Sequence, residues 1–381
     1  MKFSLGNLSK KTIIKVSILA FLLVAGYVLK LNMPSKPKEY STKEYINNVS
    51  ANNEIDKAIQ EIFDKRNKAI LDNDTKYLES IYDREHKAGT WAYEHEVKKI
   101  KYISNWEEKQ GAKFIDIKPK VIIKDVKDKG DKKTITLLCS TEYKYIYEDN
   151  KDLVNTSRIG AYHVLDVVEK NDSLVITKEW YNDPFADSLN LENLKVDSIK
   201  EFITSQKRKE SLELEEGREN AVEYAHKYSG AASEEKYGFK YNNKYKNYNY
   251  EGGDCTNFIS QVLHEGGGFK KDSTWNYSSD GATKPWVNAQ GFKDYIVYSG
   301  KGSVIDSGDY EEIYQSAYNL LPGDIVSYEE DGKIAHTAVV TDFDSKGYPL
   351  VTCHNTDRNN VPWDLGWNDS NIRFWFIKVN Y

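Results

Sequence analysis

Cysteine is scarce in this chain of 381 residues, which contains Cys139, Cys255 and Cys353. An odd and low number of cysteines does not build a disulfide framework. If the chain is exported, most of its thiols therefore stay free, and a free thiol is then a candidate for chemistry. Positive charge is not in excess either, and the net charge of −6 argues against nucleic acid as the main partner.

Long apolar runs are almost absent, and the exception is the uncharged stretch 16–29. It follows a segment with four lysines and no acidic residue. With its flanks, the run reaches the ~20 residues that a membrane-spanning helix needs. No small-x-small cleavage site and no cysteine for lipid attachment follow it, so we expect an uncleaved single-pass anchor at 1–31 in the cell membrane. The basic flank predicts that the rest lies outside the cytoplasm; a cleaved signal, and hence secretion, is the alternative.

The chain after the anchor divides into regions that differ in composition and in the spacing of their apolar residues. Residues 32–52 contain two prolines and several Ser and Asn, which is typical of a tether. In 53–190, apolar residues first recur at helical spacing and then alternate, which predicts helices followed by an antiparallel meander. This order indicates an α+β module. Its architecture resembles the cystatin-like or NTF2-like cone, in which a curved sheet wraps a long helix.

No catalytic cluster is visible in this α+β module. His86, His95 and His163 are isolated in the sequence, and each is expected to be an ordinary surface or core histidine. Cys139 lies on an apolar strand, where a packed and inert thiol is expected. The chain then continues through a charged helical connector at 191–217 into a second domain at 218–381, whose entry helix is expected to leave His226 at the surface.

The stretch 252–261 reads Gly-Gly-Asp-Cys-Thr-Asn-Phe-Ile-Ser-Gln. Asp254 stands where an N-cap would, and the apolar residues after it recur at helical spacing. Cys255 is therefore expected in the first turn of a helix, where the helix dipole lowers a thiol pKa and favours the nucleophilic thiolate. The two glycines would let a substrate backbone approach the sulfur. Cys255 is the predicted nucleophile, and a structural small residue is the alternative.

A nucleophilic thiol needs a general base from elsewhere in the fold. His336 follows a tight turn near the start of a predicted strand, and it is the predicted base. The third member, which holds the imidazole in one tautomer, is expected on the next strand. That strand offers His354, Asn355 and Asp357.

Alternation along the predicted strand separates Cys353 from His354. The two point to opposite faces, so His354 faces the site only if Cys353 lies in the core behind it. The same alternation, and the lack of a Cys-x-x-Cys pair, argue against a zinc site built from Cys255, His336, Cys353 and His354. Neither a metal nor a cofactor is expected. A Cys255–Cys353 disulfide, which would silence the site, is the remaining alternative.

Together these motifs resemble those of a known family. The stretch 252–261, Pro-Gly-Asp-Ile-Val at 322–326, Ile-Ala-His-Thr-Ala-Val-Val at 334–340 and His-Asn-Thr-Asp at 354–357 look like the putative amidase domain family. That family is similar to the papain-like NlpC/P60 and CHAP hydrolases of cell walls. The resemblance covers about 218–381. It implies a papain-like α+β domain with Cys255 as nucleophile, His336 as base and His354 as the third polar residue; because the last motif reads His-Asn, Asn355 is the other candidate for the orienting role.

The expected function is therefore that of a membrane-anchored, extracytoplasmic cysteine hydrolase. It would cleave an amide bond in a cell-wall peptide, as an amidase or peptidase, through a thioester intermediate. An acyltransferase that passes the acyl group to an amine or alcohol is one alternative. A non-catalytic binding or scaffold protein at the cell surface, with a retired site, is the other. The expected partners are the wall peptide or another amide substrate and, through the N-terminal helix, the membrane.

Overall fold

The computed structural model describes residues 42–171, 173–186, 189–192, 194–208, 212–367 and 371–381. Within these, residues 53–381 form one compact unit, which contains every site discussed below. The predicted anchor at 1–31 lies outside the described residues. Among the described ones, no helix has both the length and the apolar character needed to cross a membrane.

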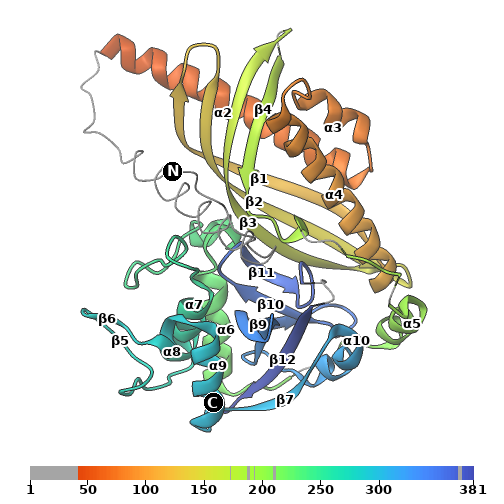
Figure 1. The fold of residues 1–381 in the computed structure, drawn as a ribbon, viewed down its shortest axis with the longest axis vertical. Helices are drawn as coiled ribbons and strands as arrows, with labels where there is room; N and C mark the ends of the chain where they lie inside the picture. Colours follow the sequence, from red (N-terminus) through yellow and green to blue (C-terminus); the bar gives the residue numbers. More distant parts are fainter. Residues whose placement is uncertain (1–41, 172, 187–188, 193, 209–211, 368–370) are drawn as a thin grey trace, which may run out of the picture. The chain divides into compact units, whose positions relative to one another are not determined.

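The first part of the described chain consists of three helices and four long antiparallel strands (Figure 1). Their bounds are α2 Thr42–Leu71, α3 Thr75–Ile81, α4 Lys87–Gln110, β1 Ala112–Asp128, β2 Lys133–Tyr147, β3 Asn150–Lys170 and β4 Ser173–Tyr181. The helical stripe predicted after Asn53 is buried, with Ile59, Phe63 and Leu78 inaccessible to solvent. The α+β order predicted for this part is confirmed.

Three details differ from the sequence prediction. α2 begins at Thr42, inside the stretch 32–52 predicted as a tether, because no proline or glycine interrupts the chain there after Pro37. Residues 134–139 and 143–147, whose alternating pattern predicts two strands, belong to one strand, β2, because residues 140–142 continue the ladder with β3. α4 was not predicted, since polar residues such as Glu96 are buried in its apolar stripe.

The second part has helices on both faces of a second set of strands (Figure 1). Its helices and turns are η1 Pro184–Ala186, α5 Val196–Ser205, α6 Glu216–Lys227, η2 Gly230–Ala232, η3 Glu235–Tyr237, α7 Cys255–Gln261, the π-turn η4 Val262–Gly266, α8 Lys284–Val287, α9 Ala289–Tyr298, α10 Tyr310–Ile313 and η5 Ser316–Asn319. Its strands are β5 Tyr277–Ser278, β6 Gly281–Ala282, β7 Gly302–Gly308, β8 Ile325–Glu330, β9 Lys333–Phe343, β10 Pro349–Cys353, β11 Asp357–Pro362 and β12 Ile372–Val379. One face of these strands carries α6, α7 and α9, and the other carries α10.

The two parts share one antiparallel sheet with the order β1-β2-β3-β11-β10-β9-β8-β12-β7, and β4 pairs with β3. The junction is short: Asp357 lies opposite Gly160, and Asn359 lies opposite Arg158. A Cβ atom on Gly160 would lie 2.2 Å from the carbonyl carbon of Ala231, so only glycine allows η2 to pack against β3 here. The stretches predicted as separate units, 53–190 and 218–381, are thus continuous through their sheets.

Buried polar contacts accompany the shared sheet. Lys109 of α4 forms an ion pair with Asp364 in which both side chains are fully buried. The hydroxyl groups of Tyr145 and Tyr147 on β2 donate to the Asp344 carboxylate, at 3.1 and 2.6 Å. The two parts are therefore joined by a buried ion pair and buried side-chain hydrogen bonds as well as by backbone hydrogen bonds between β3 and β11.

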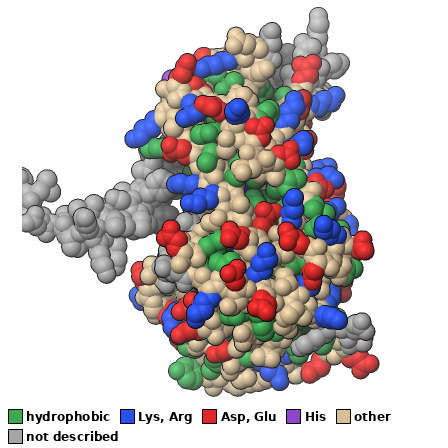
Figure 2. Space-filling view, turned by 90° about the vertical axis from the view of Figure 1, so that its right-hand side faces the viewer, with side chains coloured by type: hydrophobic (Ala, Val, Ile, Leu, Met, Phe, Trp, Pro, Cys, Tyr) green, Lys and Arg blue, Asp and Glu red, His purple; other side chains and the backbone are tan. Residues whose placement is uncertain are grey.

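The sheet of the second part separates two apolar cores. On β9, Val339 packs with Phe258 of α7 in one core, whereas Ala338 belongs to the core on the other face. Alternation along β9 therefore assigns each residue to the α7 face or to the opposite face. On the outside of the molecule, Figure 2 shows Lys and Arg side chains interspersed with Asp and Glu, without a large field of one sign on that face.

Candidate functional site

Cys255 opens α7, as the sequence predicts. Two residues before it have backbone angles that favour glycine, with φ of 112° at Gly252 and 117° at Gly253. A Cβ atom on Gly253 would lie 2.2 Å from Nδ2 of Asn355, whereas one on Gly252 would meet nothing within 4 Å. The missing side chain of Gly253 thus leaves room for Asn355. At Gly252, by contrast, a side chain would face open space.

The Cys255 thiol is buried, with 5% of the residue exposed. Burial raises the pKa of the Cys255 thiol, although hydrogen bonds from the Thr256 side chain and the Thr337 backbone oppose this effect. The pKa decrease expected from the helix dipole is therefore wrong for this state, because desolvation of the thiolate outweighs the favourable dipoles. Cys255 is held as a neutral thiol beside β9.

Asp254 connects the start of α7 to His354, the residue that directly follows β10. Its Oδ1 accepts the backbone N–H of Tyr248 at 2.8 Å and the side-chain amide of Asn257 at 2.9 Å. Its Oδ2 lies 2.6 Å from Nδ1 of His354. Asp254 occupies the N-cap position, but its side chain makes no bond to the first-turn amides. The expected capping bond is wrong because His354 and the preceding loop occupy the carboxylate.

Asn355 binds the same residue from the other side. Its side-chain oxygen accepts the backbone N–H of Asp254 at 2.6 Å. Asn355 has a left-handed backbone with φ of 67°, a conformation that asparagine adopts more readily than most residues. His354 and Asn355 are therefore both fixed to the residue just before the predicted nucleophile.

His354 has a hydrogen-bond acceptor at each ring nitrogen. Nδ1 faces the Asp254 carboxylate, and Nε2 lies 2.7 Å from the backbone oxygen of Tyr228. Two acceptors require two N–H donors, which is the imidazolium form. Burial acts to lower the pKa of His354, but the bond to Asp254 outweighs it and the pKa is raised. The ring also stacks on Phe258, with 3.9 Å between ring centroids.

His336 lies on the other face of β9. Its ring is 5.0 Å from that of Trp367 and 5.4 Å from that of Tyr328, both of which pack in or against the core opposite α7. Its Nε2 is buried without a hydrogen-bond partner among the described residues. Burial, assisted by the charge of Arg358, lowers the pKa of His336 to about 3, so the imidazole is neutral at pH 7.

The four predicted site residues are therefore only partly brought together. Asp254 links the helix of Cys255 to His354 and Asn355, whereas His336 points toward Trp367. Among the described contacts, no hydrogen bond joins the Cys255 sulfur to either histidine. Asp357, the other residue considered for the orienting role, instead accepts the Tyr241 hydroxyl and the Ala231 backbone N–H.

Cys353 is fully buried on the face opposite to that of His354, as alternation predicts. The cysteines are free, so the alternative Cys255–Cys353 disulfide is not formed. Within the described residues, no group of three or more His, Cys, Asp or Glu side chains is arranged to hold a metal ion.

Parts of the chain are similar to known proteins. Residues 215–377 match the family model described as "Putative amidase domain". The chain is also 26% identical over 293 residues to "Uncharacterized protein YhbB" of Bacillus subtilis (strain 168), a match that covers 71% of this chain and 83% of that protein. It is 37% identical over 150 residues to "Uncharacterized protein YjcM" of the same organism, which covers 35% of this chain and 32% of that protein. No solved structure matches.

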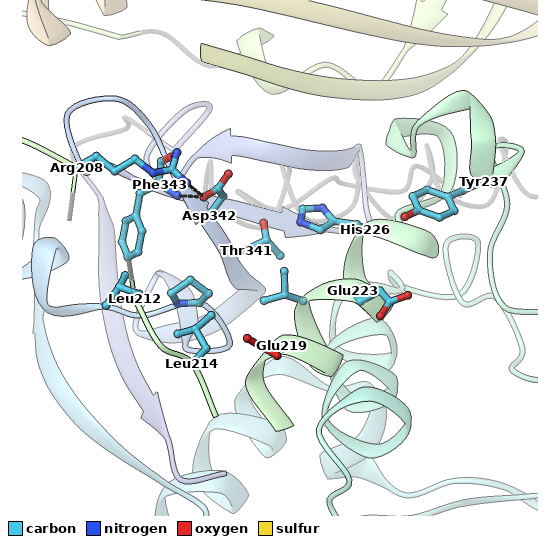
Figure 3. Close-up of a pocket in the computed structure, with 12 residues that line it drawn as sticks. Arg208, Leu212, Leu214, Glu219, Glu223, His226, Tyr237, Thr341, Asp342 and Phe343 are labelled. Atoms are coloured by element: carbon cyan, nitrogen blue, oxygen red, sulfur yellow. Dashed lines mark hydrogen bonds and ion pairs between the residues drawn. The ribbon is translucent and has the colours of Figure 1, made fainter. Parts of the chain in front are cut away.

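A hollow of about 500 Å³ lies between residues of this amidase-family region and the segment just before it (Figure 3). It is lined by Arg208, Leu212, Leu214, Glu219, Val222, Glu223, His226, Tyr237, Pro322, Thr341, Asp342 and Phe343. At one end Arg208 binds the Asp342 carboxylate at 2.6 Å. His226, predicted to lie at the surface, is partly buried and pairs with the Asn359 side chain at 2.7 Å. None of the predicted site residues lines this hollow.

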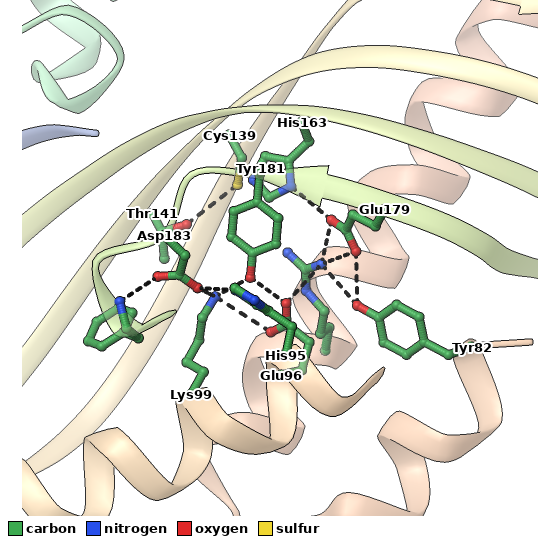
Figure 4. Close-up of polar contacts among 12 residues, drawn as sticks. Tyr82, His95, Glu96, Lys99, Cys139, Thr141, His163, Glu179, Tyr181 and Asp183 are labelled. Atoms are coloured by element: carbon green, nitrogen blue, oxygen red, sulfur yellow. Dashed lines mark hydrogen bonds and ion pairs between the residues drawn. The ribbon is translucent and has the colours of Figure 1, made fainter. Parts of the chain in front are cut away.

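A second polar cluster, which the sequence did not reveal, lies inside the first part of the chain (Figure 4). Arg66 binds Glu179 at 2.9 Å, and Lys99 binds Asp183 at 2.7 Å, with all four side chains buried. His163 contacts Glu179 at 2.8 Å, and His95 contacts Asp183 at 3.0 Å. His95 and His163, which are isolated in the sequence, are brought to this one cluster by α4, β3 and β4, where His163 is a buried core residue and His95 is partly exposed.

Electrostatics in this buried cluster favour the ionised carboxylates, whereas burial lowers the pKa of His163 and favours its neutral form. Burial acts to raise the pKa of Glu179, but Arg66 and His163 outweigh it and hold the pKa well below its ordinary value. Burial also acts to raise the pKa of Asp183, and Lys99 and His95 reverse that effect. Cys139 is buried nearby, where its sulfur lies 3.4 Å from the Thr141 hydroxyl; burial raises the pKa of this thiol. Cys139 is thus packed, as predicted, although beside a polar cluster.

Proposed function

We propose that the amidase-family region hydrolyses an amide bond with Cys255 as the nucleophile. The observation that carries the proposal is the set of bonds made by Asp254, which connects the helix of Cys255 to both His354 and Asn355. Residues 100 positions apart in the sequence are thereby fixed to the residue that precedes Cys255. The match of residues 215–377 to the amidase family supports the reaction class.

His336 is the base in this proposal, in keeping with the sequence prediction. A base needs an accessible nitrogen, and Nε2 of His336 has no hydrogen-bond partner in the described part of the chain, whereas both ring nitrogens of His354 are occupied. The Cys255 proton passes to His336, the thiolate attacks the carbonyl carbon, and the tetrahedral intermediate expels the amine with that proton. Water, deprotonated by His336, then hydrolyses the thioester and restores the thiol.

His354 acts in this scheme as a fixed positive charge. Its imidazolium offsets the charge of the Asp254 carboxylate, which by itself raises the pKa of the Cys255 thiol. In the structure the His336 ring packs against Trp367 on the face of β9 opposite α7, so the proposal requires a change in the backbone around His336, and not only a turn of its ring, to bring Nε2 to Cys255 when substrate binds. Catalytic hydrogen bonds in substrate-free enzymes are often long and tighten in the complex.

The substrate and the location complete the proposal. We infer that the amide belongs to a cell-wall peptide, on the basis of the resemblance to wall hydrolases. We also infer that the apolar run 16–29 anchors the chain in the membrane with residues 42–381 outside the cytoplasm. A retired site in a binding or scaffold protein is the second candidate, and the neutral, buried state of the Cys255 thiol is the observation that favours it.

The test is hydrolysis of purified cell-wall peptides by the full chain in detergent, followed by mass spectrometry of the products. Cys255→Ala should abolish hydrolysis, and His336→Ala should lower kcat by at least ~100-fold, the usual contribution of a general base. His354→Gln should lower kcat less than His336→Ala. Full activity in the Cys255 variant would overturn the proposal, and a larger loss in the His354 variant would exchange the roles of the two histidines.

A further inference from the structure

The first part of the chain places a tyrosine beside the site of the second part. β3 pairs with β11 through Gly160 and Asp357, and Tyr162 lies two residues further along β3. Side chains two residues apart on a strand share a face, so Tyr162 lies on the face of Gly160, against which η2 packs. Its neighbour His163 points to the other face and enters the buried cluster of Figure 4.

The surroundings of Tyr162 belong to the site of Cys255. Asp357 accepts a hydrogen bond from the Tyr241 hydroxyl at 2.6 Å, and the Tyr241 ring packs edge-on against His354 with 4.6 Å between centroids. Partial burial, together with Asp357 and Tyr250, raises the pKa of Tyr162 to about 12. Tyr162 is thus close to a chain of contacts that ends at His354.

Tyr162 is nevertheless open to solvent, with 37% of the residue exposed. Tyr250, which precedes the glycines before Cys255, is 74% exposed. Beyond Tyr162 on the same face, Val164 lies directly opposite Trp180 of β4, and these residues are 38% and 49% exposed. Exposed aromatic and apolar side chains therefore continue from the site along the sheet of the first part.

We propose that Tyr162 and Tyr250 bind the peptide that flanks the scissile amide, so that the first part of the chain determines substrate specificity. This inference rests on the proposed function of Cys255. Tyrosine rings offer large, rigid contact surfaces, and their hydroxyl groups bind backbone amides, which suits an extended peptide with small side chains. Val164 and Trp180 extend the surface for longer peptides. The two parts share a sheet because substrate contacts both.

The experiment compares two reagents that alkylate Cys255 in the full chain. Acetyl-dialanyl chloromethyl ketone carries a peptide, whereas iodoacetamide does not. The ratio of their second-order rate constants measures peptide recognition independently of turnover, and mass spectrometry with Cys255→Ala assigns the modified residue. Tyr162→Ala should lower the ratio about 3- to 10-fold, in line with the worth of an aromatic contact. Tyr162→Phe should retain most of the ratio.

Trp91→Ala is the matched control, since Trp91 is an aromatic residue of α4 that is 58% exposed. It should leave the ratio unchanged. An unchanged ratio in Tyr162→Ala, or an equal decrease in Trp91→Ala, would overturn the inference. Failure of the proposed function is seen separately, as absence of amide hydrolysis by a protein whose Cys255 still reacts with both reagents.

Discussion

The pair of Asp254 and His354 gives the sharpest test of the site, because two substitutions at one position separate charge from hydrogen bonding. Asp254→Ala removes the acceptor of three hydrogen bonds and leaves a buried imidazolium without its counter-charge. Loss of one partner of a buried ion pair costs about 3–5 kcal/mol. We expect this decrease in the free energy of unfolding for the alanine variant.

Asp254→Asn should cost less. The asparagine oxygen can keep the bonds from Tyr248 and Asn257, while its NH2 group faces Nδ1 of His354. Nδ1 can accept that bond if His354 becomes neutral, and Nε2–H still donates to Tyr228. An ion pair is thus exchanged for a neutral hydrogen bond, and we expect a loss of about 1–2 kcal/mol near pH 8.

The pH dependence of the stability difference between wild type and Asp254→Asn shows whether His354 is charged in the folded protein. The folded pKa of His354 is raised above its unfolded value of ~6.5, so its stabilising contribution is fully present below that pH. The contribution is lost as pH rises through the folded pKa, at no more than about 1.4 kcal/mol per pH unit. The difference between wild type and Asp254→Asn should therefore be largest below pH 6.5 and should shrink toward pH 8.5.

Urea unfolding followed by tryptophan fluorescence between pH 5.5 and 8.5 measures this difference. Asp324→Asn is the matched control, since Asp324 pairs with Arg218 at 2.8 Å in a buried site whose cation does not titrate. Its loss of stability should be constant over the same pH range. If the Asp254→Asn difference is equally flat, His354 is not an imidazolium in the folded protein and the reasoning is refuted.

Three further predictions concern other parts of the molecule. Iodoacetamide should alkylate Cys255 of the substrate-free protein slowly at pH 7, because burial raises the pKa of the Cys255 thiol. An ordinary thiol is about 3% thiolate at this pH and is the reference for the rate. Alkylation faster than this reference would contradict the prediction. Glu179→Gln should lower the free energy of unfolding by up to about 3–5 kcal/mol at pH 7, since it removes the nearer counter-charge of the buried Arg66 and leaves it, among the described residues, only Glu96, at 3.8 Å, as an ion-pair partner. That loss should diminish as the pH falls toward the lowered pKa of Glu179 in acid-unfolding curves, and a constant loss would show that the carboxylate is not ionised. A fragment of residues 215–381 should lack a cooperative urea transition, because β11 loses its partner β3 and Asp364 loses Lys109; a native-like transition would show that the shared sheet is not required.

Local periodicity explains what the sequence could predict. The start of α7 at Cys255, the strand of His336 and the opposite faces of Cys353 and His354 all follow from residues close together in the chain. Each depends on spacing within one helix or strand, and spacing fixes which face a side chain occupies. Spacing does not determine which residues from other helices and strands pack against that face. Hence His336 was placed on the correct strand, while its packing against Trp367 could not be foreseen.

Long-range pairing explains most of what was missed. The buried cluster joins Arg66, Glu96, Lys99, Glu179 and Asp183 from three elements of secondary structure and the segment after β4. In the sequence, Glu96 and Lys99 interrupt the apolar stripe of α4 and look like solvent-facing residues. Only the curvature of the four long strands over α2 and α4 makes those positions interior. A charged residue of this kind can be recognised as buried only when the residue with which it forms an ion pair is known.

The junction of the two parts is the clearest case. Lys109 and Asp364 are 255 residues apart, and neither position is marked in the sequence as buried. Replacing such a pair by apolar residues of similar size is often neutral or stabilising, so stability alone does not explain why a buried pair is present. A buried pair does penalise any register in which one charge remains unpaired. We therefore infer that Lys109 and Asp364 help to align β3 with β11, and this alignment is what places Tyr162 beside the site of Cys255.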